Sequence, residues 1–343
     1  MKKVLVFTLA ASLVACKAPK PKSVEEANPV EYANTITPDE LREHLFTFAS
    51  DEFEGRETGE PGQKLAAEYL KTEYKKLEIP SPLGEDDYFQ EVPSSVFTRG
   101  DVKPSENVLA YIKGSTLPEE VLVISSHYDH VGIDDEGNIF NGADDDGSGT
   151  VAILEIAEAF KKAKEDGFGP KRSILFLNVT GEEKGLVGSK YYTDNPVFPL
   201  AQTVTNLNID MIGRIGEGKE EAGDYVYLIG SDKLSTELHE LSEAVNQKYL
   251  NMELDYKYND ENDPNRFYYR SDHYNFAKND IPIIFYFNGV HEDYHQPTDT
   301  PDKIEYDLLA KRAKLIFLTA WEVANRDQRP FVDKPTLAEE AGE

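Results

Sequence analysis

The chain has 343 residues, 39% of them hydrophobic, which is long enough for one large α/β domain with a buried core. It carries 64 acidic against 36 basic side chains, giving a formal net charge of -28 at pH 7. Such a surface repels phosphate groups, so we exclude nucleic acid as a main partner. Part of the charge favours cationic partners, such as the free amino terminus of a peptide.

The N-terminus has the pattern of an export signal. Basic residues at 2 and 3 precede an apolar run over 4–15, which is too short to span a membrane and is typical of a signal peptide. The run ends in Leu-Val-Ala-Cys16, which resembles a bacterial lipobox, where the cysteine becomes the acylated first residue. Cys16 is the only cysteine, which excludes an intrachain disulfide and a multi-thiolate metal site.

We therefore expect an exported protein that is anchored to the cell envelope by a lipid on Cys16. Lys17 is not the aspartate that signals retention in an inner membrane, so the expected place is the outer membrane or the periplasmic face. Residues 16–35 contain three prolines and are predicted to form a flexible tether.

From residue 36 to 328 the sequence alternates helical and strand patterns, without a linker or an internal repeat. The patterns predict a helix beginning at Thr37, helices over 63–77, 151–163, 234–249 and 306–325, and a short helix after the Glu182-Glu183 turn that ends near residue 192. They predict strands at 88–96, 106–113, 121–125, 174–179, 206–211, 225–229 and 281–287. The second helix is expected to be amphipathic, with Leu65, Tyr69 and Leu70 near one face. This order predicts a single three-layer α/β domain with a largely parallel sheet, followed by an acidic tail over 329–343.

Several predicted strands end in side chains that can hold a metal. His127, the Glu182-Glu183 pair, Asp210 and His295 each follow an apolar run. The carboxyl ends of parallel strands meet at one edge of a sheet, so these side chains are expected to converge. Two adjacent carboxylates are explained by a nearby cation, with one glutamate as ligand and the other as base for a water molecule.

The loop with Asp144, Asp145 and Asp146 adds further ligands near this edge. Imidazole and carboxylate without sulfur suit zinc, and cobalt or manganese less selectively. Each piece has a plainer explanation, since Asp146 or Ser148 could cap a helix at Gly149 and a glutamate pair is often surface charge. Only the combination predicts a metal site. The stretch at 255–270, rich in tyrosine, asparagine and aspartate and without a clear period, is a candidate lining of a substrate cleft.

Five motifs occur in sequence order: Ser126-His-Tyr-Asp129, Gly142-Ala-Asp-Asp-Asp-Gly-Ser-Gly149, Gly181-Glu-Glu-Lys-Gly-Leu-Val-Gly-Ser189, Asn208-Ile-Asp-Met211 and Tyr294-His-Gln-Pro-Thr-Asp-Thr300. Together they resemble the motifs of the M28 family of zinc aminopeptidases, over about residues 38–325. Glu54-Gly-Arg56 and Ser271-Asp-His273 are similar to two further motifs of that family. The resemblance implies an α/β/α sandwich with a mixed sheet, and peptides with a free N-terminus as substrates.

The resemblance also implies a set of ligands for two zinc ions. Asp145 would bridge the ions, His127 and Asp210 would complete one shell, and Glu183 and His295 would complete the other.

Three further roles follow from the same resemblance. Glu182 would be the general base and acid, Asp129 would orient the imidazole of His127, and the phenol of Tyr294 would stabilise the oxyanion.

The residues also leave other functions open. Glutaminyl cyclases share the fold and much of the ligand set. The resemblance implies that cyclases carry tryptophan at the position of Tyr294, so the tyrosine favours a peptidase. A carboxypeptidase-like or dipeptidase activity, or a non-catalytic surface receptor, would also fit the fold. A serine hydrolase would need Ser148 as nucleophile, but its surroundings lack the Gly-x-Ser-x-Gly spacing. Residues 142–150 contain no lysine, so they are not a phosphate loop. The oligomeric state is not indicated.

Overall fold

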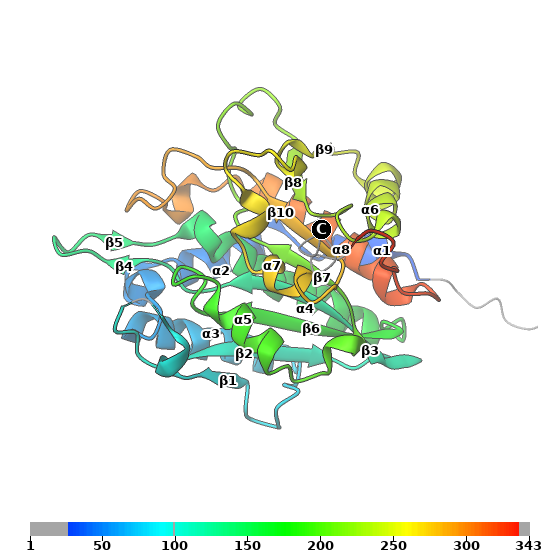
Figure 1. The fold of residues 1–343 in the computed structure, drawn as a ribbon, viewed down its shortest axis with the longest axis horizontal. Helices are drawn as coiled ribbons and strands as arrows, with labels where there is room; N and C mark the ends of the chain where they lie inside the picture. Colours follow the sequence, from blue (N-terminus) through cyan, green and yellow to red (C-terminus); the bar gives the residue numbers. More distant parts are fainter. Residues whose placement is uncertain (1–26, 99, 336–343) are drawn as a thin grey trace, which may run out of the picture.

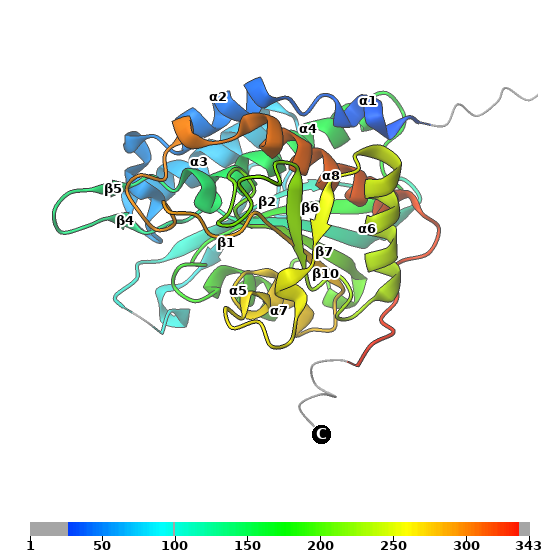
Figure 2. The same ribbon diagram turned by 90° about the horizontal axis from the view of Figure 1, so that it is seen from above.

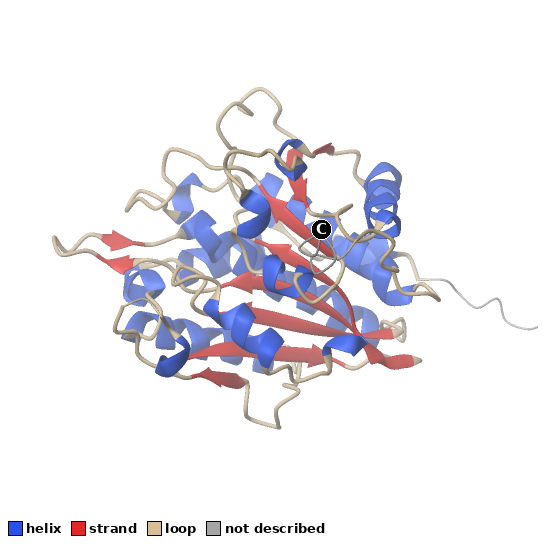
Figure 3. Ribbon diagram, viewed as in Figure 1, coloured by secondary structure: helices blue, strands red, loops and turns tan. Residues whose placement is uncertain are grey.

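The structure is a computed structural model that describes residues 27–98 and 100–335. Its centre is an eight-stranded sheet with the order β1-β2-β6-β3-β7-β10-β8-β9, beside a separate hairpin of β4 and β5 (Figures 1 and 3). The strands are β1 Phe89–Val92, β2 Ser105–Ile112, β3 Leu117–His127, β4 Gly132–Ile133, β5 Ile139–Phe140, β6 Arg172–Val179, β7 Thr203–Ile209, β8 Tyr225–Ile229, β9 Glu253–Asp255 and β10 Ile283–Phe287.

The four central strands β6, β3, β7 and β10 are parallel to one another. β2 and β8 run antiparallel to their central neighbours, so the sheet is mixed and largely parallel, as predicted. All residues of β6, β7, β8 and β10 are buried, which explains why these strands are nearly continuous apolar runs rather than alternating ones. Because the central strands share a direction, their carboxyl ends lie at one edge of the sheet.

Helices cover both faces of the sheet, and this gives three layers. The helices are α1 Pro29–Ala33, α2 Pro38–Phe48, α3 Pro61–Lys76, α4 Gly149–Glu165, α5 Val187–Asp194, α6 Thr236–Tyr249, α7 His273–Ala277 and α8 Tyr306–Asn325. Figure 2 shows α2, α3, α4 and α8 on one face, α5 and α7 on the other, and α6 beside α8 at one end. The buried apolar side chains accordingly form two clusters. The predicted α/β/α sandwich is confirmed.

Part of the predicted tether is folded. Asn28 accepts a hydrogen bond from the Val30 amide and caps α1, and Tyr32 is 5% exposed and stacks on Trp321 of α8. The prediction of a tether through residue 35 is therefore wrong at its C-terminal end, because aromatic packing outweighs the polar composition. Cys16 and the predicted signal peptide lie outside the described residues.

The tail also begins later than predicted. Arg329 donates hydrogen bonds to the carbonyl groups of Ala201 and Thr203, and the Asp333 amide donates to the Leu234 carbonyl. Residues 329–333 thus pack on the domain.

The helix predicted over 63–77 forms as α3, but Leu65 was placed wrongly. The buried stripe of α3 follows Ala66, Ala67, Leu70 and Tyr74, whereas Leu65 lies off that stripe and is 47% exposed. No helix in the described part of the chain is long and apolar enough to cross a membrane.

Candidate active site

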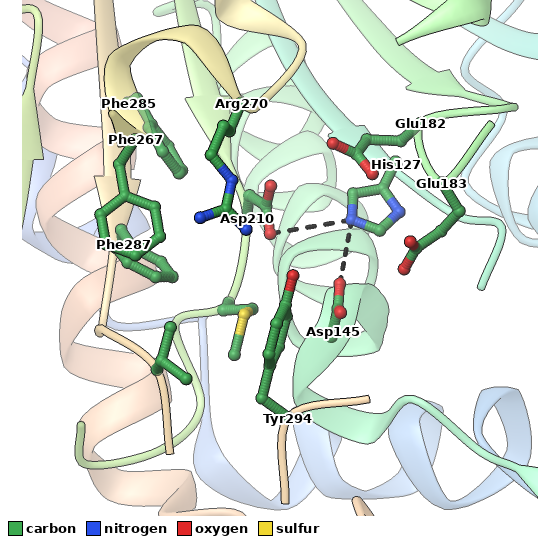
Figure 4. Close-up of a pocket in the computed structure, with 12 residues that line it drawn as sticks. His127, Asp145, Glu182, Glu183, Asp210, Phe267, Arg270, Phe285, Phe287 and Tyr294 are labelled. Carbon is green, nitrogen blue, oxygen red and sulfur yellow. Dashed lines mark ion pairs between the residues drawn. The ribbon is translucent and has the colours of Figure 1, made fainter. Parts of the chain in front are cut away.

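The carboxyl ends of the central strands bring the predicted site residues together. His127 is the last residue of β3, Asp210 follows β7 directly, and the Glu182-Glu183 turn comes three residues after β6. Together with Asp145, these side chains line one pocket of about 380 Å³, open solvent included (Figure 4). The convergence that the sequence predicts is therefore present.

The first group of possible metal ligands is His127, Asp145 and Asp210. The His127 Nε2 atom lies 3.1 Å from Asp145 Oδ1 and 3.7 Å from Asp210 Oδ1. Its Nδ1 atom donates to the Asp129 carbonyl oxygen at 3.0 Å, which leaves the Nε2 lone pair facing the carboxylates. The Ser271 hydroxyl donates to Asp210 Oδ2 at 2.6 Å and fixes that carboxylate.

The second group shares Asp145 and lies around Glu183. His295 Nε2 is 3.0 Å from Asp145 Oδ2 and 3.1 Å from Glu183 Oε1. A residue that the sequence reasoning did not assign, His130, belongs here too, with its Nδ1 atom 3.2 Å from Glu183 Oε1 and 3.8 Å from Asp145 Oδ2. His130, Asp145 and Glu183 can together hold a metal ion. Asp145 thus offers one oxygen to each group.

Unpartnered polar atoms support metal binding at the second group. Among the described residues, Asp145 Oδ2, Glu183 Oε1 and both ring nitrogens of His130 are buried atoms without a hydrogen bond, although imidazoles lie within ion-pair distance of the two oxygens. Buried polar atoms without a partner are costly, and most proteins avoid them. A cation between these atoms would satisfy the two carboxylate oxygens and His130 Nδ1, the ring nitrogen that faces Glu183. A donor set of imidazole nitrogen and carboxylate oxygen fits zinc.

The pKa values of the adjacent Glu182 and Glu183 are shifted in opposite directions. Burial raises the pKa of Glu182 well above 4.5, and the negative charges of Glu183 and Asp210 add to this effect. Burial acts in the same direction on Glu183, but the imidazoles of His130 and His295 outweigh it and lower the pKa of Glu183 to about 2. Glu183 is therefore suited to be a ligand, and Glu182 is suited to hold a proton.

Asp129 acts differently from the prediction. Its carboxylate lies 3.8 Å from His127 Nδ1, and the imidazole binds the backbone carbonyl of Asp129 instead. The carboxylate accepts hydrogen bonds from the Thr58 hydroxyl at 2.6 Å and from the Glu182 amide at 3.2 Å. Asp129 therefore positions His127 through its main-chain carbonyl group and Glu182 through its carboxylate.

The three consecutive aspartates have three separate tasks. Asp145 faces the metal groups, whereas Asp146 accepts hydrogen bonds from the Gly149 and Met211 amides and so caps α4. Asp144 accepts from the Ser148 hydroxyl and the Gly213 amide. Ser148 is fully buried, which gives a serine nucleophile no support.

Of His291, Asp293 and Tyr294 in the loop after β10, Tyr294 is the one that lines the pocket. His291 binds Asp144 at 3.0 Å, and Asp293 binds Arg214 at 2.9 Å and Lys303 at 2.6 Å. Figure 4 shows the Tyr294 hydroxyl directed inward, between Asp210 and Asp145. It is therefore placed to donate a hydrogen bond to a bound substrate.

An aromatic wall completes the pocket on the side away from the glutamates. It consists of Phe267, Phe285 and Phe287, with Arg270 extending over the Phe267 ring at 5.0 Å (Figure 4). Phe267 and Arg270 lie in the stretch at 255–270, so the prediction that this stretch lines a cleft is confirmed. The wall suits an apolar side chain of a substrate.

The sequence matches the model of peptidase family M28 over residues 107–320. The chain belongs to this family. Leupeptin-inactivating enzyme 1 from Streptomyces exfoliatus is 28% identical over 283 residues, covering 82% of this chain and 53% of that protein. Aminopeptidase YwaD from Bacillus subtilis is 26% identical over 247 residues, covering 70% of this chain and 49% of that protein. The chain spans about half the length, or less, of the curated relatives it matches.

Solved structures share the M28 fold with this chain. The LapA aminopeptidase from Legionella pneumophila superposes with a TM-score of 0.67 at 21% identity, covering 95% of this chain and 81% of that one. A glutaminyl cyclase from Bacteroides thetaiotaomicron gives a TM-score of 0.65 at 17% identity, covering 85% and 99%. At these identities the likeness establishes the sandwich fold alone, so the activity has to be argued from the site.

Proposed function

We propose that this M28 protein is a zinc-dependent aminopeptidase that hydrolyses the first peptide bond of peptides with a free N-terminus. The observation that carries the proposal is the position of Asp145, whose two oxygens face two groups of histidine and carboxylate beside Glu182. Two ions fit this arrangement, with cobalt or manganese as possible substitutes for zinc. His127 and Asp210 would hold one ion, and Glu183 and His295 the other.

When bound, the zinc ions would supply Lewis acidity to a water molecule and to the scissile carbonyl group. Glu182 accepts the proton of the attacking water, since it lies in the pocket and its raised pKa matches a proton carrier. It then gives this proton to the leaving amine. Tyr294 donates a hydrogen bond to the oxygen that becomes negatively charged during attack.

The acidic pocket supports an exopeptidase rather than an endopeptidase. Asp145, Glu183 and Asp210 supply acidic groups around the pocket, and the net charge of -28 would draw the cationic amino group of a peptide toward it. The aromatic wall of Phe267, Phe285 and Phe287 would hold the side chain of the first residue.

The experiment compares wild type with Glu182→Gln on a panel of aminoacyl anilides, with zinc content measured in both. Loss of the proton carrier is expected to lower kcat by about 10³-fold or more while two zinc ions stay bound. Glu119→Gln is the matched control, since Glu119 is exposed near the start of β3, at the opposite end from His127, and should keep full activity. Near-normal turnover in folded, zinc-loaded Glu182→Gln would exclude the mechanism.

The same preparation separates the remaining alternatives. Cyclisation of an N-terminal glutamine without anilide hydrolysis would favour the cyclase. No reaction on anilides or longer peptides by the zinc-loaded protein would favour a receptor. Full activity in the presence of a strong chelator would favour chemistry without a metal.

The proposed location rests on sequence alone. The apolar run over 4–15 and the lipobox-like Cys16 support export and a lipid anchor on the cell envelope. Labelling of cells with a radioactive fatty acid is expected to mark the wild type but not Cys16→Ser. Equal labelling of the two proteins would refute the anchor.

A further inference from the structure

We propose that His130 is a fourth protein ligand of the ion held by Asp145, Glu183 and His295. The inference rests on the proposed binding of two ions and adds a difference between them. The ion beside His130 has a complete set of protein ligands, whereas the ion at His127 and Asp210 keeps an open place for substrate.

The first argument is the state of the His130 ring. The residue is 0% exposed, and neither ring nitrogen has a hydrogen-bond partner among the described residues. A buried imidazole normally donates at least one hydrogen bond, as His273 does through its Nε2 atom to the Tyr268 carbonyl at 2.8 Å. No hydrogen bond to a described residue therefore explains the burial of the His130 ring, and its polar neighbours are the carboxylates of the site.

The second argument is the spacing of the donor atoms. In a tetrahedral zinc site with bonds of about 2.0–2.2 Å, neighbouring donor atoms are about 3.4 Å apart. His130 Nδ1 lies 3.2 Å from Glu183 Oε1 and 3.8 Å from Asp145 Oδ2. His295 Nε2 lies 3.0 and 3.1 Å from the same two oxygens. Both imidazoles thus face the same pair of carboxylate oxygens, and each of the four distances is within about 0.4 Å of that spacing.

The third argument is that the surrounding backbone makes room for this ring and holds it. A Cβ atom on Gly142 would lie 2.5 Å from Cδ2 of His130, so only glycine fits there. The Arg56 side chain donates to the Gly142 carbonyl at 2.8 Å, and the His130 amide donates to the Arg56 carbonyl at 3.1 Å. These contacts hold the main chain of His130 and place the backbone of Gly142 directly against its ring.

The two ion positions then differ in the number of protein ligands. His127, Asp145 and Asp210 form a set of three at the pocket surface, which is the composition of a catalytic site with an open position. The position at Glu183 has four, which is the composition of a structural site. We therefore expect the ion at Glu183 to bind more tightly and to exchange more slowly.

The direct experiment is crystallography of the zinc-loaded wild type, with anomalous scattering to locate the ions. The expected result is an ion about 2.0–2.1 Å from His130 Nδ1. An ion at the Glu183 position with His130 Nδ1 more than about 3 Å away would overturn the inference. The rest of the proposed function would then stand, provided that two ions are present and anilides are cleaved.

A second measurement uses zinc competition with a chromogenic chelator on His130→Gln. Loss of a ligand is expected to weaken one zinc equivalent by more than about 100-fold and to leave the other within a few fold, whereas loss of a residue that only orients a ligand costs about 10- to 100-fold. His273→Gln is the matched control, because it removes another buried imidazole and should keep both affinities. Unchanged zinc affinities in His130→Gln would refute the inference, and two bound ions without any hydrolysis would refute the proposed function instead.

Discussion

Arg56 connects the framework of the fold to the candidate active site, and its replacement by methionine should damage both. The guanidinium group is fully buried and donates to the carbonyl oxygens of Tyr128 at 2.9 Å, Asn141 at 2.6 Å and Gly142 at 2.8 Å. It also donates to the Phe48 carbonyl oxygen at 3.3 Å and lies over the Phe48 ring. Burial lowers the pKa of Arg56 to about 10, so the group stays charged at neutral pH.

The size of the effect follows from these bonds. In Arg56→Met four buried carbonyl groups lose a charged donor, and each such loss costs about 1–3 kcal/mol when nothing replaces it. The four losses are not additive, because the chain can relax and admit water, so we expect the free energy of unfolding to fall by about 3–5 kcal/mol. Tyr128 and Gly142 flank the segments that carry His127, His130 and Asp145, so zinc affinity should also fall, by about 10- to 100-fold.

The assay combines urea unfolding of the zinc-depleted protein with zinc competition at neutral pH. Arg172→Met is the control, because Arg172 is equally buried and donates to the carbonyl oxygens of Val323 and Arg326, far from the pocket. It should lose comparable stability but keep its zinc affinity within about threefold. If Arg56→Met unfolds within about 1 kcal/mol of wild type and binds zinc normally, the reasoning is wrong.

Two further predictions concern Tyr294 and Glu155. Tyr294→Phe removes a donor that acts on the developing oxyanion, so kcat on anilides should fall by about 10²–10³-fold with little change in KM; a rise in KM alone would contradict this role. Glu155 of α4 is 2% exposed, and burial raises its pKa from 4.5 to about 8. The folded protein therefore keeps a proton that the unfolded chain releases, so this contribution to stability is complete below pH 4.5 and is lost as the pH rises to about 8. In urea unfolding, the free energy of unfolding of Glu155→Gln relative to wild type should rise by about 2–3 kcal/mol from pH 6 to pH 8. If this difference between variant and wild type is the same at both pH values, the prediction is wrong.

The sequence predicted the site well where strand ends determine it. His127, Asp210 and the Glu182-Glu183 pair each follow an apolar run, and parallel strands bring such positions to one edge of the sheet. His130 was missed although it stands three residues from His127. It lies beyond the end of β3, where the direction of a side chain depends on contacts with Arg56 and Gly142 rather than on strand alternation.

The errors in the fold have the same origin. The five residues of α1 are too few for a helical period, and their burial depends on Tyr32 stacking on Trp321 at the other end of the chain. Leu65 is a long apolar residue in a real helix, but the stripe of α3 that faces the core is set by how the helix lies on its neighbours. Local patterns thus predict which elements form, and tertiary contacts decide which of their side chains are buried.

The difference between Glu182 and Glu183 illustrates how such contacts create chemistry. The two carboxyl groups are adjacent in the chain and both largely buried, yet their pKa values shift in opposite directions. The cause lies in other segments, because His130, just beyond β3, and His295, in the loop after β10, lie against Glu183 and not against Glu182. Glu182 instead lies among the negative charges of Glu183 and Asp210. A pair of like charges at a strand end therefore becomes a ligand and a proton carrier only because three distant segments surround its two members differently.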